Sequence, residues 1–129
     1  MEKNIILCDT NILIEFYKNN PNIVAQLNEI GAENIAISAV SAGELLFGAL
    51  NKREVLAIKK DIEHLILLHI NDLVSKKFIE LMLTYSKSHG LAVPDALIAA
   101  TALVNEIPLY TLNMKDFKFI ENLLFYNKR

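Results

Sequence analysis

Short, continuously apolar segments alternate along the chain with longer segments whose apolar residues recur at helical spacing. The apolar segments have the length of buried strands and cover residues 4–8, 34–38, 66–70, 108–112 and 123–126. The segments between them predict helices over residues 10–19, a stretch closed by Gly31, 41–50, 52–65, 72–88 and 94–105, with a single turn at 113–117. Continuous apolar strands separated by helices are typical of a parallel sheet covered on both faces, so the pattern predicts an α/β fold.

Length and composition indicate one ordered domain spanning residues 1–129. Hydrophobic residues make up 53% of the chain and charged residues 22%, which is enough apolar material for a packed core without disulfides. The single cysteine, Cys8, excludes an internal disulfide, and we interpret it as a small core residue in a reducing compartment.

No segment approaches the roughly 20 apolar residues of a membrane span, and the polar start at residues 1–4 does not resemble a signal peptide. We therefore expect a cytoplasmic protein that does not bind membranes. The net charge of −2 counts against a broad basic surface for nucleic acid. It does not exclude an enzyme that meets phosphate groups through metal ions.

Three acidic residues follow apolar strands. Asp9, Glu44 and Asp116 each lie within a few residues after a predicted strand. In a parallel sheet the carboxyl ends of the strands share one edge, and ligands bind beyond that edge. The pattern therefore predicts that these three acids lie along the same edge. A fourth acid, Asp95, follows a helix, so the pattern alone does not place it there.

Three of these acids also have a local explanation as helix caps. Asp9 fits an N-cap, and Ser41 with Glu44 fits a capping box in which serine begins the helix. Asp116, three residues after Asn113, fits a similar local cap. Taken one at a time, these residues do not distinguish a cap from a site.

Asp95 lies in the first turn after Pro94, where the helix dipole favours an acid. It also shares one helical face with Ile98, Ala99 and Ala102, the face expected to be buried. A carboxylate in a partly apolar setting needs a cation or hydrogen-bond donors. The position of Asp95 therefore favours a functional role.

Four short motifs around these acids resemble those of the PIN-domain family, and most closely its VapC-type toxins. The motifs occur in the family's order over nearly the whole chain: residues 9–14 (DTNILI), residues 38–40 with 43–45 and Gly48, residues 95–100 (DALIAA), and residues 111–113 with Asp116 and Phe117. Each motif is loose, but four in this order in a chain of this length are fairly specific.

The resemblance implies a three-layer α/β/α sandwich with a parallel sheet of about five strands. It also implies an endoribonuclease, a hydrolase of RNA phosphodiester bonds that uses Mg²⁺ or Mn²⁺, and a toxin of a toxin–antitoxin pair. The family's acidic positions fall on Asp9, Glu44, Asp95 and Asp116. Polar positions around the acids fall on Asn11, Thr111 and Asn113.

A carboxylate cluster without nearby His or Cys suits Mg²⁺ or Mn²⁺ and not zinc, because hard cations take oxygen ligands. Two carboxylates about 4 Å apart repel by about 4 kcal/mol at an effective dielectric of about 20, and a bound cation removes that repulsion. We expect Asp9 and Asp95 to be direct ligands, with Glu44 and Asp116 acting through water, orienting the nucleophile or holding a second ion. Thr111 and Asn113 would donate hydrogen bonds to the ligands.

Two other classes of protein also place an acid after the first strand of a parallel sheet. Haloacid-dehalogenase-like phosphatases need a second Asp two residues after the first, where this chain has Asn11. A receiver domain needs an acid next to Asp9 and a late lysine, for which Lys115 is a poor match. A PIN-like binding module without catalysis, a nuclease outside a toxin–antitoxin pair and cleavage of DNA stay open.

The VapC-type resemblance also implies a small antitoxin protein that lies in a groove. Residues 45–65 carry more apolar side chains than one core face needs, namely Leu45, Leu46, Phe47, Leu50, Val55, Leu56 and Ile58. A core of this size, an antitoxin groove and a homodimer face all account for this surplus, and we expect a homodimer in addition to the antitoxin.

Overall fold

The computed structural model describes residues 4–127. In chain order its elements are β1 (Ile6–Cys8), α1 (Thr10–Tyr17), α2 (Pro21–Ile30), the 3-10 helix η1 (Ala32–Asn34), β2 (Ile35–Ser38), α3 (Ala39–Phe47), α4 (Lys52–Glu63), β3 (Ile66–Leu68), α5 (Asp72–Tyr85), α6 (Val93–Asn105), β4 (Leu109–Tyr110) and the 3-10 helix η2 (Met114–Asp116). Each predicted helix is present, and most end one to three residues earlier than the apolar pattern predicts.

The sheet is parallel throughout and has the strand order β3-β2-β1-β4. The predicted fold class is confirmed, but the expected fifth strand at residues 123–126 is wrong. That segment makes an isolated parallel bridge, in which Leu109 N donates to Leu124 O and Tyr126 N donates to Leu109 O, both at 2.9 Å. A single bridge of this kind does not make the segment a strand of the sheet.

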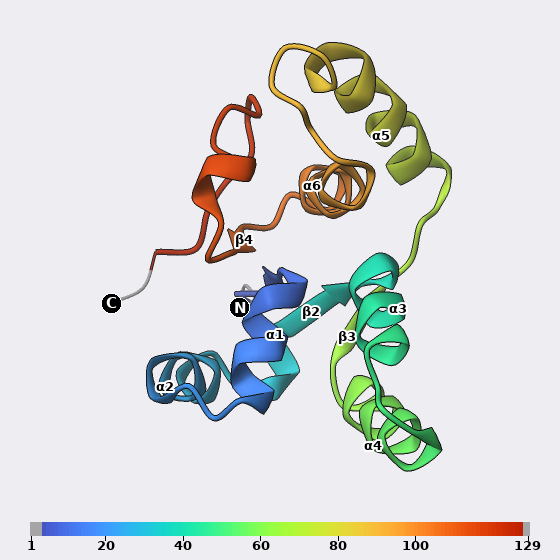
Figure 1. Cartoon of the computed structure of the whole chain (residues 1–129). Coiled ribbons are helices and arrows are strands. Elements are labelled where there is room, and N and C mark those ends of the chain that lie inside the picture. Colours follow the sequence, from blue (N-terminus) through green and yellow to red (C-terminus); the bar gives the residue numbers. More distant parts are fainter. Residues whose placement is uncertain (1–3, 128–129) are drawn as a thin grey trace.

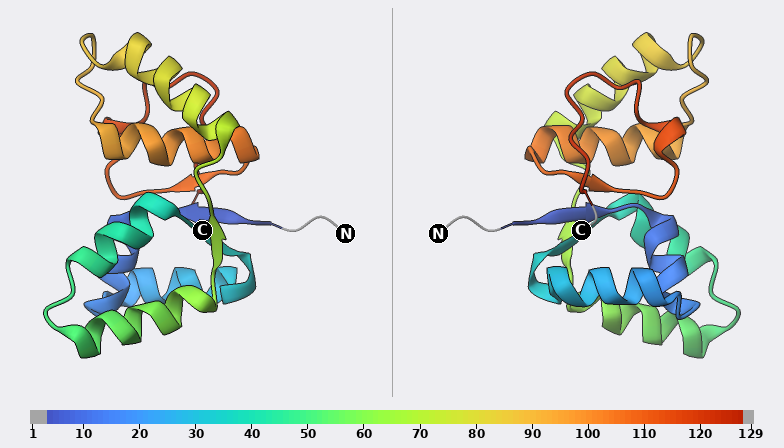
Figure 2. Two further views of the ribbon diagram at one scale, coloured as in Figure 1. Left: turned by 90° about the vertical axis from the view of Figure 1, so that its right-hand side faces the viewer. Right: turned by 90° about the vertical axis from the view of Figure 1, so that its left-hand side faces the viewer.

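Helices cover both faces of the sheet, which gives three layers (Figures 1 and 2). Side chains alternate along β1, so Leu7 packs towards α5 and α6, while Ile6 and Cys8 pack towards α1 and α2. All three are buried. Burial raises the pKa of the Cys8 thiol to about 12, with a further contribution from the charge of Asp9, which makes Cys8 an unreactive core residue.

The order of the strands reverses at β1. The chain runs outward from β1 through β2 to β3 and then returns to place β4 on the opposite side of β1. In open parallel sheets the crevice at such a reversal, beyond the carboxyl ends of the strands, is where ligands bind. Asp9 directly follows β1 and Thr111 directly follows β4, so both lie at this reversal.

The predicted capping box at Ser41 is wrong. The N-cap of α3 lies three residues earlier, because the side chain of Ser38 is the N-cap and accepts a hydrogen bond from Ser41 N at 3.1 Å. Ser41 is therefore inside the helix and fully buried. The change matters for function, because it leaves Glu44 without a capping role.

The predicted stop of α2 at Gly31 is confirmed, since its φ of 87° favours glycine.

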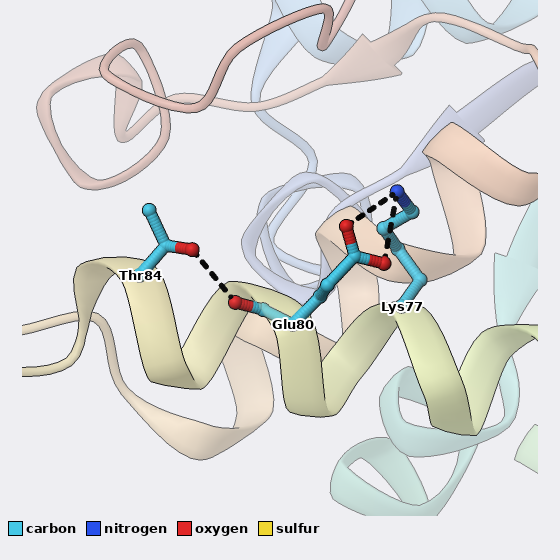
Figure 3. A network of polar contacts seen from close by, with 3 residues as sticks. All are labelled: Lys77, Glu80 and Thr84. Atoms are coloured by element: carbon cyan, nitrogen blue, oxygen red, sulfur yellow. Dashed lines mark hydrogen bonds and ion pairs between the residues drawn. The ribbon is translucent and has the colours of Figure 1, made fainter.

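The outer surface of α5 carries ordinary exposed charge. Figure 3 shows Lys77 paired with Glu80, with 3.3 Å between Lys77 Nζ and Glu80 Oε2, and Thr84 Oγ1 donating to the backbone oxygen of Glu80 at 2.9 Å.

Among residues 4–127, no helix combines the length and apolar character that crossing a membrane requires.

Candidate active site

Asp9 is the most firmly held of the predicted site residues. It is buried at the N-cap of α1, where Oδ1 accepts from Thr10 N and Oδ2 accepts from Thr111 Oγ1, both at 2.8 Å. Thr111 Oγ1 in turn accepts from Asn113 N at 3.0 Å. Asp9 is therefore both the N-cap of α1 and a residue of the site. One oxygen of Asp9 begins the helix, and the other is fixed by the neighbouring strand end.

Glu44 is reached by a chain of hydroxyl groups. Thr10 Oγ1 lies 2.7 Å from Glu44 Oε1 and 2.8 Å from Ser41 Oγ, and Ser38 Oγ lies 3.2 Å from Ser41 Oγ. A hydroxyl has one hydrogen and a carboxylate only accepts, so Thr10 donates to Glu44 and Ser41 supplies the hydrogen of its bond to Thr10. Ser38 then donates to Ser41. We call these three residues the hydroxyl relay; every member points its hydrogen towards Glu44.

The remaining predicted residues come from three further segments. Asp95 is half-buried in the first turn of α6, whose inward face carries the fully buried Ala99 and Ala102, as the sequence predicts. Asp116 is half-buried at the end of η2. Asn11 is exposed in the first turn of α1.

A cavity of about 590 Å³ gathers most of these side chains; we call it the acidic cavity. Its lining includes three carboxylates and three hydrogen-bonding side chains: Asp9, Glu44, Asp95, Thr10, Asn11 and Asn113. Ile14, Val40, Gly43 and Phe47 complete the wall. Of the described residues that line it, none is Lys, Arg or His. Gly43 leaves this side open, because no atom lies within 4 Å of where its Cβ would stand.

The four acids are electrostatically coupled. Burial raises the pKa of Asp9 above its ordinary value, and the charges of Glu44 and Asp116 raise it further, while hydrogen bonds from Thr111 and Thr10 lower it. Burial also raises the pKa of Asp95 to about 6, with further contributions from the charges of Asp9, Asp116 and Glu44. Asp116 therefore belongs to the cluster, although it does not line the cavity. Together the four carboxylates form a negative site in which no ion pair is made within the described part of the chain.

The donor set fits a hard divalent cation in its chemistry. It offers carboxylate and amide oxygens and no nitrogen or sulfur ligand, which suits Mg²⁺ or Mn²⁺. Within residues 4–127, no group of three or more His, Cys, Asp and Glu side chains is arranged to hold a metal ion as it stands. Mg²⁺ keeps several of its waters and needs only one or two carboxylates, so it does not require such a cage.

Sequence reasoning missed the hydroxyl relay. Ser41 was interpreted as a cap, and Thr10 and Ser38 were given no role beyond the motifs in which they stand. A signal for Thr10 was present, because a hydroxyl residue directly follows Asp9 at the helix start. No signal in the sequence links Thr10 to Glu44, since 34 positions separate them and only packing of α1 against α3 brings them together.

Fold and site together define a class of protein: an α/β/α domain with an acidic, oxygen-rich pocket at the carboxyl edge of its sheet. Comparison with known sequences makes this specific, because the PIN-domain profile matches residues 6–121. The chain belongs to the PIN-domain family.

Individual relatives match over nearly their full length. The chain is 31% identical to ribonuclease VapC1 of Methanocaldococcus jannaschii, covering 98% of this chain and 90% of that protein. It is 34% identical to ribonuclease VapC2 of Rickettsia felis, covering 95% and 97%. Among solved structures, a toxin–antitoxin complex from Klebsiella pneumoniae contains a chain with a TM-score of 0.78 and 27% identity, covering 92% and 95%.

Proposed function

We propose that this protein is a divalent-metal-dependent endoribonuclease and the toxin of a toxin–antitoxin pair of the VapBC type. The observation that carries the proposal is the convergence of Asp9, Glu44, Asp95 and Asp116 on one site, where none of them forms an ion pair with a cationic side chain of residues 4–127. These acids come from four separate segments, so local helix capping does not explain why they meet. The names of the relatives supply the expectation that RNA is the substrate.

The chain's own residues prepare the site in two ways. Thr10 N and Thr111 Oγ1 hold both oxygens of Asp9, so this carboxylate does not rotate away when charge enters the cavity. The hydroxyl relay holds Glu44 at one oxygen and leaves its other oxygen without a protein donor among the described residues. Hydroxyl donors orient a carboxylate but do not cancel its charge, so the negative potential is kept.

Asp9 and Asp95 would be the direct ligands of Mg²⁺ or Mn²⁺, with Glu44 and Asp116 close by. When bound, such a cation supplies Lewis-acid stabilisation of the charge that develops on a phosphodiester and makes a water molecule more acidic. The acidic cavity alone repels a phosphodiester, so we expect cleavage to depend strictly on the cation.

An apolar groove beside the acidic cavity supports an antitoxin partner. A cavity of about 700 Å³ lies between α1, α3 and α4, and it shares Ile14 and Glu44 with the acidic cavity. Part of the predicted apolar surplus is exposed here, since Leu50 lines the groove and is 84% exposed, and Phe47, on the wall of the adjoining acidic cavity, is 93% exposed. A partner segment lying in this groove reaches the acids directly. A homodimer and a cytoplasmic location remain predictions from the sequence.

The test of catalysis is incubation of the purified protein with labelled single-stranded RNA and with labelled DNA, in Mn²⁺ and in chelator. We expect RNA cleavage in Mn²⁺ that chelator abolishes and that Asp9→Asn reduces by at least about 100-fold. Glu29→Gln, an exposed acid on α2, is the matched control and keeps full activity. Cleavage that persists in chelator or in Asp9→Asn contradicts the proposal. Cleavage of DNA but not of RNA contradicts the assignment of RNA as the substrate.

The partner is tested separately. Leu50→Asp places a charge in the groove at an exposed position, so the fold is kept. We expect this variant to lose the small protein that co-purifies with the wild type from its host, while cleavage of RNA in Mn²⁺ is unchanged. Retention of that protein by Leu50→Asp would place the partner on another surface.

A further inference from the structure

A second cavity, of about 370 Å³, lies at the same edge of the sheet, next to the acidic cavity. We propose that it binds one unpaired nucleobase of the RNA strand whose backbone lies at the four acids. We call it the base cavity. Its lining is Asn20, Asn22, Ile23, Tyr110, Thr111, Leu112, Met114, Phe125, Tyr126 and Asn127. The inference rests on the proposed function, because it names a substrate contact of that same enzyme.

The base cavity is joined to the catalytic acids through one residue. Thr111 lines the base cavity, and its hydroxyl donates to Asp9 Oδ2 at 2.8 Å. Asn113 lines the acidic cavity, and its backbone N–H donates to the same Thr111 oxygen at 3.0 Å. A strand of RNA with a phosphodiester at Asp9 therefore has a neighbouring nucleotide beside the base cavity.

The two cavities differ in charge, and this difference selects the part of a nucleotide that each accepts. Among the residues of 4–127 that line the base cavity, none has an acidic or basic side chain. A phosphate finds no cation among these lining residues, whereas a nucleobase is uncharged at neutral pH. The acidic cavity, in contrast, accepts the phosphodiester only together with a cation.

Aromatic and apolar side chains give the base cavity flat surfaces. Tyr110 and Tyr126 are in ring contact, with centroids 4.9 Å apart and planes at 53°. Tyr126 OH donates to Gln26 Oε1 at 2.9 Å, which fixes that ring. Leu112 and Met114 are about half exposed at its edge. Unpaired RNA bases are recognised by stacking on such surfaces together with hydrogen bonds to the edges of the bases.

Two polar side chains of the lining make no side-chain hydrogen bond within residues 4–127. The hydroxyl of Tyr110 is buried, which is unfavourable without a partner, and it contacts a base only when neighbouring side chains move. The side chain of Asn22 is exposed and makes no hydrogen bond within residues 4–127, whereas Asn20 is already engaged as the cap of α2. An amide offers a donor and an acceptor together, the combination that distinguishes one base edge from another.

The test uses uncharged nucleosides, which need neither metal nor catalysis to bind. The ¹⁵N-labelled full chain is titrated with adenosine, guanosine, cytidine and uridine and followed by NMR. We expect one nucleoside to shift the side-chain amide of Asn22 and the backbone amide of Thr111 more than the other three do. Tyr110→Phe and Asn22→Ala should each raise its dissociation constant by about tenfold. Asn28→Ala, at the other end of α2 and also exposed, is the matched control and leaves binding unchanged.

The inference is overturned if no nucleoside moves these resonances, or if Tyr110→Phe and Asn22→Ala bind as the wild type does. Tyr110→Phe also reports on structure: an unpartnered hydroxyl contributes no stability, so its removal should not lower the melting temperature. A lower melting temperature with unchanged nucleoside binding assigns the hydroxyl to a buried water and overturns the inference.

Cleavage of a random RNA pool separates this inference from the proposed function. Nucleoside binding that the variants lose supports the base cavity even if the wild type cuts no RNA, in which case the proposed function alone fails. If the wild type cuts RNA, Tyr110→Phe should weaken base preference at one position next to the cleaved bond. An unchanged preference at every position overturns the base cavity and leaves the nuclease in place.

Discussion

Acidic side chains occur in two contrasting settings in this molecule. On the outer surface of α5, Glu80 has Lys77 one turn away, and the Glu80 side chain is 67% exposed (Figure 3). In the acidic cavity, Asp9 and Asp95 have other acids as neighbours. Asp9 accepts from a backbone N–H and a hydroxyl, and within residues 4–127 the side chain of Asp95 has no hydrogen-bond donor. An acid is thus paired with a lysine on the α5 surface, where the ion pair contributes little to stability. The acids of the acidic cavity, where mutual repulsion is strong, form no ion pair within residues 4–127.

This difference indicates what each region is for. A surface ion pair is screened by water and contributes little to stability. A cluster of partly buried carboxylates destabilises the folded protein until a cation or a proton arrives. The fold therefore retains an unfavourable arrangement that only a ligand relieves, and the following predictions use that property.

The largest effect is expected from metal binding itself. Mn²⁺ or Mg²⁺ at 100 times its dissociation constant stabilises the folded chain by about 2.7 kcal/mol, because it binds the folded state only. For a domain of this size that gain raises the melting temperature by about 10 °C. Asp9→Asn and Asp95→Asn should each lose most of the gain, as measured by thermal unfolding with and without chelator.

The control for metal binding is Glu80→Gln, which removes an acid from the α5 surface and should keep the full gain. Equal stabilisation of Asp95→Asn and the wild type would show that the cation binds elsewhere. Such a result would contradict the inference that the acids of the acidic cavity, unlike those of the α5 surface, bind the cation.

The second effect concerns pH in the absence of metal. The pKa of Asp95 is raised to about 6, mainly by burial and then by the charges of Asp9, Asp116 and Glu44. Its folded state therefore holds a proton more tightly than the unfolded state. The resulting stability is present below about pH 4 and is lost as the pH rises through about 6.

Asp95→Asn should therefore stabilise the metal-free protein at pH 7 and flatten its stability between pH 4 and 7. A full conversion at about 1.4 kcal/mol per pKa unit overstates the gain, because Asp95 is only half-buried, so we expect about 1–2 kcal/mol. Urea unfolding in chelator at several pH values measures it. A destabilised Asp95→Asn would mean that the charge of Asp95 is already compensated.

The fold was largely predictable because its signals are local. Continuous apolar strands and helical spacing are properties of neighbouring residues, and they located the six α-helices and the four strands of the sheet among residues 4–127 but not the short helix η1. The segment at residues 123–126 has the same apolar character, but whether it forms a ladder depends on its pairing with β4, which no local pattern reports.

The site was predictable only in part, for a related reason. The ends of parallel strands share an edge, so the positions of Asp9, Glu44 and Asp116 followed from topology alone. Asp95 needed the family resemblance, because it begins a helix that follows no strand. The hydroxyl relay depends on packing of α1 against α3, which the local sequence does not report. The sequence pattern also places the N-cap of α3 at Ser41, three residues after the true cap Ser38, and so does not predict that Ser41 is buried.

A smaller effect tests whether the relay acts on Glu44. Ser41→Ala removes the hydroxyl between Ser38 and Thr10, and the net loss of such a hydrogen bond is about 1 kcal/mol of stability. In a double-mutant cycle, Ser41→Ala and Glu44→Gln should be coupled by at least about 0.5 kcal/mol in urea unfolding, because they share Thr10. Ser41→Ala with Glu80→Gln should be additive. Additivity in both cycles would reduce the relay to local packing of α3.

The smallest effect on stability is expected at the α5 surface, where the acid is already paired with a lysine. Glu80→Gln removes the partner of Lys77 but keeps the backbone oxygen that accepts from Thr84, so only the exposed ion pair is lost. We expect a loss of less than about 0.5 kcal/mol in urea unfolding, decreasing further with added salt. The same acid-to-amide change thus slightly destabilises the protein at Glu80 and stabilises it at Asp95. A loss above about 1 kcal/mol at Glu80 would show that pairing with lysine matters on this surface, and the contrast between paired and unpaired acids would then lose its energetic basis.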